Sequence, residues 1–454
     1  MEKVQGLVNL VKTILKFGII LLLGYFAGQV AVGPFSIYLK IAIFILPVIG
    51  ILLFLNPMLG FMILLFIRPL VDPLRDYYLV GGVNLLGVFS FINVLFAVYV
   101  LIKAQNVRLF PENIKWFYLY LFIALLSIVN SSDIGISFIF LMKLISIMAL
   151  FLLAYNLPES LDDALKIIKV VFISSVIPIA YGIYQLIAGV GVQPAKVGLL
   201  EGVFRIQSTF SLSNGFAFYL GIIILLFVLR QFYLHRKAEN AVNIFIFTGA
   251  LVCLVYTYTR VIWLSTLLSL ACIAVFEKKL RKWLIILTLI CIPLFSGKIL
   301  KRVDDLINPP KYGTNSLEFR LTIAKELLFN AVPKHPLLGF GLGTSEDVAS
   351  KYTKFNIVPH NDYIRVLVET GILGFTVYLV FLGKIFFYLL GLIRRKVNFH
   401  ANAVFLGILM FYLISSMGQN IFTNVSGLGY IFVLMGLAQK INDISEADKE
   451  EKSI

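Results

Sequence analysis

The sequence predicts an all-α, polytopic membrane protein, and three observations support this fold class. Hydrophobic residues occupy 60% of the 454 positions and charged residues only 14%, whereas a soluble domain has about 45–50% apolar and about 25% charged residues. Apolar runs of about 18–22 residues recur along the chain, each long enough to cross about 30 Å of hydrocarbon as a helix. The runs are continuous and do not alternate, which argues against a transmembrane barrel.

The number of such runs predicts about 12–14 transmembrane helices. The runs at 57–69 and 425–438 are short, so each of them either crosses the membrane or re-enters it. The first run is interpreted as an uncleaved helix because no small-residue cleavage site is obvious. Residues 1–454 are therefore expected to form a single integral membrane domain. The predicted spans are 14–31, 36–55, 57–69, 83–102, 115–131, 134–156, 167–189, 214–232, 241–257, 261–276, 282–298, 364–392, 400–418 and 425–438.

The net charge of +15 is distributed as the positive-inside rule requires. If the N-terminus is cytoplasmic, every short basic connection and the charged C-terminal tail fall on the cytoplasmic side. Charges in this arrangement orient a membrane protein and do not indicate a nucleic-acid partner. The basic connections contain Lys103 and Arg108; Lys166 and Lys169; Arg236 and Lys237; Lys278, Lys279, Arg281 and Lys282; and Arg394, Arg395 and Lys396.

A long loop, residues 299–360, is expected on the extracytoplasmic side within this membrane domain. Apolar residues recur at helical spacing from Ser316 to Asn330, which predicts an amphipathic helix lying against the membrane or over a cavity, with Ser316 as its cap. Outer segments around Arg205, at Arg260 and in this loop contain basic residues that orientation does not explain. Polar chemistry is therefore expected on the outer face.

Two other patterns indicate structure more than chemistry. The glycine-rich segment 339–343 resembles a phosphate-binding loop, but no strand precedes it and no suitable helix with a downstream acid follows. We interpret it as a compact turn that returns the loop to the membrane. The three cysteines, at 253, 272 and 291, lie in successive apolar runs without metal-binding spacing and are interpreted as packing residues.

The segment after the long loop carries charges into a predicted span. Asp362, Arg365 and Glu369 extend one to two turns into the run at 364–392, where each charge costs about 2.5–3.5 kcal/mol on insertion scales. Arg365 and Glu369 are four residues apart and are expected to pair. These side chains should face a cavity or another helix. His360 stands at the outer end of this span, where a histidine is either an interfacial residue or part of a site.

Several arginines near one histidine suggest a site for an anionic group. A guanidinium group binds phosphate oxygens bidentately and stays charged when partly desolvated. A diphosphate carried by a membrane lipid fits, with its headgroup at the interface and its tail in the bilayer. Arg205 and Arg260 can also simply extend to the lipid headgroups. The anion site requires that both arginines meet His360 in space.

Four motifs resemble the O-antigen ligase and O-antigen polymerase superfamily of bacterial surface-polysaccharide enzymes. His360-Asn361, nine further residues and then Gly371 and Gly374 match the His-Asn motif of the ligases. The chain departs from the family at Ser208, where glycine is frequent, at Ser213, where proline is frequent, and at Thr259, where serine is common. The other matches are His335, Pro336, Gly339, Gly341 and Gly343; Thr259, Arg260 and Trp263; and Arg205, Thr209, Phe210 and Asn214.

This resemblance implies an all-helical membrane fold of the type-C glycosyltransferase kind. It also implies transfer of a glycan from a polyprenyl (undecaprenyl) diphosphate carrier to a hydroxyl acceptor, on the outer face of the bacterial inner membrane. The partners would be that donor, a glycan or lipid-linked acceptor, and the bilayer. His360 would be catalytic, and Arg205, Arg260 and Arg320 would bind the diphosphate. Supporting roles are expected for Asn214, Asn361, Asp362 and Arg365.

The expected chemistry is inverting and needs no metal or cofactor. A neutral imidazole can take the proton of a sugar hydroxyl, and fixed arginines can stabilise the departing diphosphate.

Within the family, a polymerase of O-antigen, capsular or teichuronic-type chains is the alternative to a ligase. A protein O-oligosaccharyltransferase is less favoured, because no large outer domain follows the last span. From another class, a transporter of lipid-linked oligosaccharide would also need many helices and a cationic cavity.

Overall fold

The computed structural model confirms the all-α fold class. It describes residues 55–76, 85–103, 107–190, 193–194, 204–233, 240–282, 316–353, 359–422 and 424–453. The spans predicted at 14–31, 36–55 and 282–298 lie outside these residues except for Leu55 and Lys282, and so do 299–315 and 354–358 of the loop predicted at 299–360. The described residues are helical, with turns and one pair of two-residue antiparallel strands, β1 (Gln193–Pro194) and β2 (Phe204–Arg205).

Every predicted span within the described residues coincides with a helix. Six helical segments are long and apolar enough to cross a membrane, and four shorter helices are also apolar, which confirms a polytopic membrane protein. The helices are α3 (Pro57–Ile67), α4 (Leu85–Lys103), α5 (Lys115–Ser127), α6 (Ile134–Asn156), α7 (Leu161–Ile173), α8 (Val176–Ala188), α9 (Ser213–Tyr233), α10 (Asn240–Tyr256), α11 (Arg260–Phe276), α13 (Ser316–Glu326), α14 (Ser345–Thr353), α15 (Asp362–Arg394), α16 (Phe399–Ser415) and α17 (Val425–Ser453).

Two spans differ from their predicted bounds. The span predicted at 167–189 begins earlier, because Ser160 caps α7 by accepting a hydrogen bond from Asp163 N (3.2 Å). It is also broken between α7 and α8, where the hydroxyls of Ser174 and Ser175 donate to backbone carbonyls of the preceding turn. The last span was predicted to end at 438, and α17 continues to Ser453.

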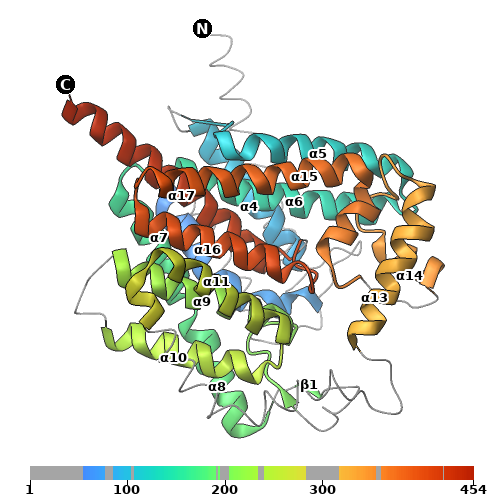
Figure 1. The fold of residues 1–454 in the computed structure, drawn as a ribbon, viewed down its shortest axis with the longest axis horizontal. Coiled ribbons are helices and arrows are strands. Elements are labelled where there is room, and N and C mark those ends of the chain that lie inside the picture. The colour runs from blue at the N-terminus through green and yellow to red at the C-terminus, as the bar shows by residue number, and fades with distance from the viewer. Residues whose placement is uncertain are drawn as a thin grey trace.

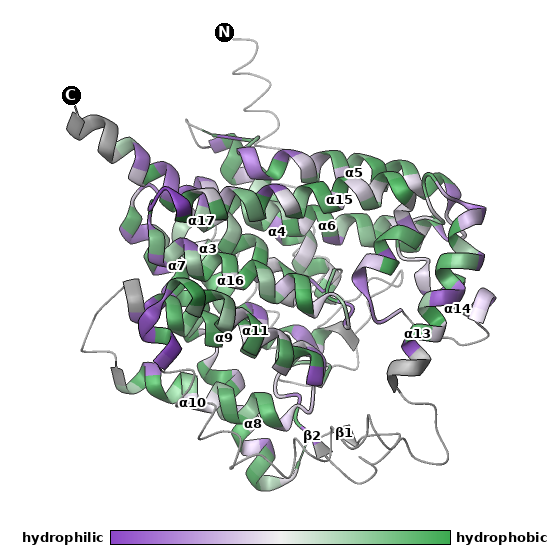
Figure 2. Ribbon diagram, viewed as in Figure 1, coloured by the Kyte–Doolittle hydropathy of each residue, from purple (hydrophilic) through white to green (hydrophobic). Residues whose placement is uncertain are grey.

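The helices form a layered bundle (Figure 1). α15 lies along α5, α6 packs against α4 and α17, and α16 contacts both α9 and α11. α10 and α8 cover the side of α9 away from α5. Apolar residues dominate the length of these helices (Figure 2), and α9 is the most buried of the six spanning segments.

Opposite ends of the bundle carry different features. The C-terminal end of α17 projects at one end, whereas α13 and α14 lie at the other, beyond the ends of α5 and α15 (Figure 1). Arg108 pairs with Asp443 (3.4 Å) and Arg395 with Glu446 (4.0 Å) at the α17 end. Two basic connections and the tail that were predicted to share the cytoplasmic side are therefore neighbours in space.

The segment before α15 folds back onto a break in that helix. At Gly371 the backbone has φ 63° and ψ −170°, which interrupts the helix. The interruption separates Val368 O from Ile372 N, which would be partners in a continuous helix. Val368 O instead accepts from Phe340 N (2.9 Å), and Ile372 N donates to Pro336 O (2.8 Å). This segment thus supplies the hydrogen bonds that the break removes.

The glycine-rich segment 339–343 is the turn that makes this contact possible, as predicted. Gly339 has φ 68°, and a Cβ atom there would lie 2.5 Å from Val368 O. Asn130 Nδ2 donates to Gly339 O (2.9 Å), and Ser137 Oγ donates to Leu342 O (2.6 Å). The segment therefore lies between α15 and the start of α6, and its glycines are explained by close backbone packing.

Replacing Gly371 by alanine is expected to destabilise the protein by at least about 2 kcal/mol. The new Cβ atom would lie 2.3 Å from Leu337 O, and φ 63° is unfavourable for any other residue. The matched control is Gly383→Ala, in the same helix, where nothing lies within 4 Å of the Cβ position. Thermal unfolding in detergent should show a lower midpoint for Gly371→Ala only. Equal midpoints would contradict the proposed packing.

Candidate functional site

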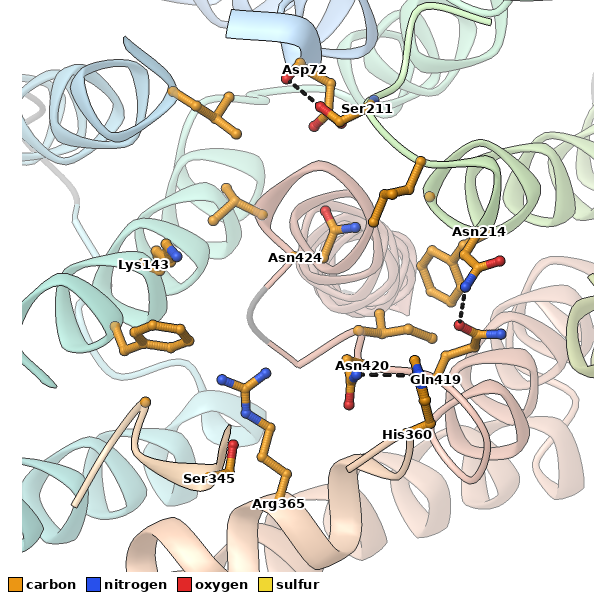
Figure 3. Close-up of a pocket in the computed structure, with 18 of the residues that line it drawn as sticks. Asp72, Lys143, Ser211, Asn214, Ser345, His360, Arg365, Gln419, Asn420 and Asn424 are labelled. Atoms are coloured by element: carbon orange, nitrogen blue, oxygen red, sulfur yellow. Dashed lines mark hydrogen bonds between the residues drawn. The ribbon is translucent and has the colours of Figure 1, made fainter. Parts of the chain in front are cut away.

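A cavity of about 490 Å³ lies at the N-terminal end of α15 (Figure 3), a size typical of small-molecule sites. Three residues expected from the sequence line it, namely His360, Asn214 and Arg365. Its walls come from segments far apart in the chain, as the sequence-based hypothesis requires. The other polar side chains that line the cavity are Asp72, Ser90, Lys143, Ser211, Ser345, Glu346, Gln419, Asn420 and Asn424.

His360 precedes α15 and is held on the cavity wall from two sides. Asn361 is the N-cap of α15 and accepts hydrogen bonds from Tyr363 N (3.0 Å) and Ile364 N (3.2 Å), which fixes the chain just after the histidine. The Asn420 side-chain amide lies 3.3 Å from His360 Nδ1. Burial, with a smaller effect from the positive charge of Arg320, lowers the pKa of His360 from 6.5 to about 4. The imidazole is therefore neutral at pH 7.

Arg320 lies within electrostatic reach of this histidine and Arg260 within reach of Arg320, but neither arginine lines the cavity. Arg320, on α13, donates from Nη1 to Gly418 O (3.1 Å). Burial lowers its pKa, and the charge of Arg260 at the start of α11 lowers it further. The same Arg320 charge reaches His360. Arg320 thus lies between two groups from distant segments, within electrostatic reach of the guanidinium group of Arg260 and of the imidazole of His360.

Arg205 is fixed beside the cavity by three hydrogen bonds. Its Nε donates to Thr257 O (2.9 Å), and its Nη2 donates to Asn214 Oδ1 (2.8 Å) and Thr259 Oγ1 (3.1 Å). Its Nη1 makes no hydrogen bond to any residue that the structure describes. Asn214 donates in turn to Gln419 Oε1 (3.0 Å) on the cavity wall (Figure 3). Burial lowers the pKa of Arg205.

The charges that enter α15 all face the protein interior. Asp362, Arg365 and Glu369 are 0%, 4% and 1% exposed, which confirms that they avoid lipid. Arg365 Nε donates to Glu369 Oε1 (2.9 Å), so the predicted pair is also confirmed. Asp362 Oδ2 accepts from the backbone amides of Ile421 and Phe422. Asp362 therefore positions a loop, whereas Arg365 reaches the cavity.

The connection between α16 and α17 contacts four of the expected site residues, and the sequence-based hypothesis did not include it. Its signal in the sequence is a polar stretch between two apolar runs. The stretch is rich in side-chain amides, which carry no charge and therefore do not stand out in the charge pattern. The contacts pair Gly418 with Arg320, Gln419 with Asn214, Asn420 with His360, and Ile421 and Phe422 with Asp362.

Two departures from the family pattern preserve the local backbone. Ser208, where glycine is frequent, has φ 53°, a conformation that favours glycine. Its amide donates to Gln185 Oε1 (2.8 Å), which helps to hold the turn. Ser213, where proline is frequent, is the first residue of α9, a position that suits proline. The motif residue Trp263 donates from Nε1 to Leu254 O (2.8 Å) and ties α11 to α10.

Comparison with known proteins supports the same family. Residues 244–379 match the family model described as O-antigen ligase, a segment that includes Arg260, Arg320 and His360 and excludes Arg205 and Asn214. A search of the curated proteins finds no match. With its apolar helices, the match indicates a multi-pass bacterial membrane protein of glycosyltransferase type. The resemblance predicted from the motifs is confirmed over this segment, which is similar to the O-antigen ligase family.

Proposed function

We propose that this protein transfers a glycan from a polyprenyl diphosphate carrier to a hydroxyl acceptor, as an O-antigen ligase. The observation that carries the proposal is a neutral, half-buried histidine on a cavity wall, with Arg320 within electrostatic reach of it and Arg260 within reach of Arg320. Arg260 and Arg320 repel each other, and partial burial weakens their solvation by water. A bound diphosphate would relieve both costs.

His360 is the proposed general base. With the Asn420 amide oriented so that its oxygen faces Nδ1, that nitrogen carries the proton and Nε2 is free to accept one. The acceptor oxygen attacks the anomeric carbon and its proton moves to Nε2. The bond from that carbon to the diphosphate oxygen breaks, and the lipid diphosphate departs with the electron pair. A single displacement of this kind inverts the anomeric configuration.

Arg205, Arg260 and Arg320 are proposed to bind the diphosphate and to stabilise the charge that develops on it. Because Arg205 is already oriented by three hydrogen bonds, it needs little reorganisation to bind phosphate oxygens. Fixed guanidinium charges supply the positive charge that a metal ion would otherwise provide. The proposed reaction therefore requires neither metal nor cofactor.

The proposed location is the outer face of the bacterial inner membrane, with both termini cytoplasmic. Support comes from the two ends of the bundle. Basic connections and the C-terminal end of α17 meet at one end, and α13 and α14 lie at the other (Figure 1). Within a single membrane domain, residues 299–360 are proposed to be the extracytoplasmic part.

Reconstitution in proteoliposomes should show transfer directly. With a lipid diphosphate-linked glycan and a hydroxyl acceptor, a ligase is expected to add one glycan per acceptor, and a chelator should not slow it. A ladder of lengths on the lipid would instead identify a polymerase of the same superfamily. Donor that crosses the bilayer unchanged, with no transfer product, would identify a transporter and overturn the proposal.

The pH dependence of transfer should report the environment of His360. Because its pKa is lowered to about 4, the imidazole stays neutral well below pH 6.5, and kcat/KM should fall only as the pH approaches 4. Arg320→Gln removes one of the two causes of this lowered pKa. The pKa of His360 should then rise, and the fall in kcat/KM should occur at a higher pH than in the unaltered protein. A fall in kcat/KM centred near pH 6.5 in both proteins would contradict the proposed environment of His360.

A further inference from the structure

We propose that the cavity contains a second anion-binding subsite, formed by Lys143 of α6 and Arg365 of α15. Its ligand is an anionic oxygen group of a substrate, either a phosphate or a carboxylate. The inference rests on the proposed transfer reaction and extends it, because none of Arg205, Arg260 and Arg320 lines this cavity. Lys143 and Arg365 are the cationic side chains that line it within the described residues, apart from the titratable His360.

Lys143 occupies a position that membrane insertion alone does not explain. It lies inside α6, one of the six spanning segments, with apolar residues on both sides in the sequence. A cation within such a span is costly and generally faces a functional cavity. Lys143 lines the cavity together with Phe140, one helical turn earlier. The position is therefore explained by the cavity.

Phe140 places the two cations around one aromatic ring. Lys143 Nζ lies 4.1 Å and Arg365 Cζ lies 5.0 Å from the centroid of that ring, distances at which the ring attracts positive charge. Arg365 is oriented because its Nε donates to the buried carboxylate of Glu369 (2.9 Å). Its terminal nitrogens point into the cavity (Figure 3). The subsite therefore combines a fixed guanidinium group with an ammonium group.

Two carboxylate side chains, Asp72 and Glu346, also line the cavity. Asp72 lies across the cavity from Arg365 (Figure 3) and is engaged by Arg68 (3.9 Å), by Ser211 N (3.1 Å) and by the hydroxyl of Ser426. Glu346 is exposed to solvent. Lys143 and His360 lie on different sides of the cavity (Figure 3). An anion at Lys143 would thus be a group other than the one at the reacting carbon.

Two substrate groups supply this chemistry. One is the phosphate of a second lipid-linked glycan, which would be the acceptor in a polymerisation. The other is the carboxylate of an acidic sugar within the glycan. Inorganic diphosphate and glucuronate are the corresponding probes, and glucose is the neutral control.

Footprinting of the full-length protein in detergent tests the subsite without turnover. Acylation of lysines is measured by mass spectrometry, with exposed Lys115 as the internal control. Diphosphate or glucuronate is expected to slow acylation of Lys143 at least about tenfold, with no effect at Lys115 and none from glucose. Protection by diphosphate identifies a phosphate ligand, and protection by glucuronate alone identifies a carboxylate. Equal acylation with and without both probes would overturn the subsite.

Variants give a second measurement. Lys143→Gln should raise the half-saturating concentration of the anionic substrate about tenfold, and Lys143→Arg should restore it. Lys115→Gln should have no effect. An unchanged value in a folded Lys143→Gln protein would also overturn the subsite. Footprinting of His360→Ala separates the two proposals, because that variant should lose transfer and keep the protection of Lys143.

Discussion

Replacing His360 by alanine is expected to lower the rate of glycan transfer about 10²–10⁴-fold. The imidazole is the neutral titratable base on the cavity wall, and its removal leaves the acceptor hydroxyl without a proton acceptor there. The helix cap at Asn361 and the buried Asp362 remain, so the fold should be retained. Turnover of a labelled lipid-linked donor, measured at equal amounts of membrane-inserted protein, provides the test.

A second histidine offers a matched control for this change. His400 lies in the first turn of α16, at the opposite end of that helix from the site, and pairs with Glu277. His400→Ala should therefore transfer glycan at close to the normal rate. Normal turnover by His360→Ala would remove the proposed base, and equal losses in both variants would indicate a general structural effect.

Replacing Arg205 by alanine is expected to lower kcat/KM for the donor about 10²–10³-fold. Its guanidinium group is held by Thr257, Asn214 and Thr259, so the loss removes an oriented positive charge beside the departing diphosphate. Arg205→Lys keeps the charge but not the planar fork, and it should recover only part of the rate. Kinetics with donor and acceptor varied separately provide the measurement.

Arg281 serves as the control arginine. It lies beyond the opposite end of α11 from Arg260, where its Nε donates to Ala274 O (2.8 Å). Arg281→Ala should leave donor use unchanged. If Arg205→Ala impaired acceptor use more than donor use, the proposed diphosphate role would be wrong.

The fold was predictable because lipid restricts the possible structures. A continuous apolar run in a bilayer must satisfy its own hydrogen bonds, so hydropathy alone located each described span. The bounds were less predictable. The break between α7 and α8 depends on hydroxyl groups at Ser174 and Ser175 that bond to the preceding turn, a local competition that hydropathy does not record.

The candidate site was predictable where it depends on charge or on a recognisable motif. His360, Asn214 and Arg365 carried such signals, and the cavity brings them together. Lys143 carried the weaker signal of a single cation inside an apolar run, and only the packing of α6 shows which cavity it lines. Gln419 and Asn420 are uncharged and contribute through contacts to segments far away in the sequence, which no local pattern specifies.

The connection between α16 and α17 acts as a common reference for the whole site. Asn214, Arg320 and the pair His360 and Asp362 come from three separate regions of the chain, yet each side chain contacts this one short stretch. A small displacement of the stretch would carry all four side chains together and keep their mutual spacing. The mutual alignment of these side chains therefore depends on one segment, so that a change in its length or backbone would be transmitted to all of them.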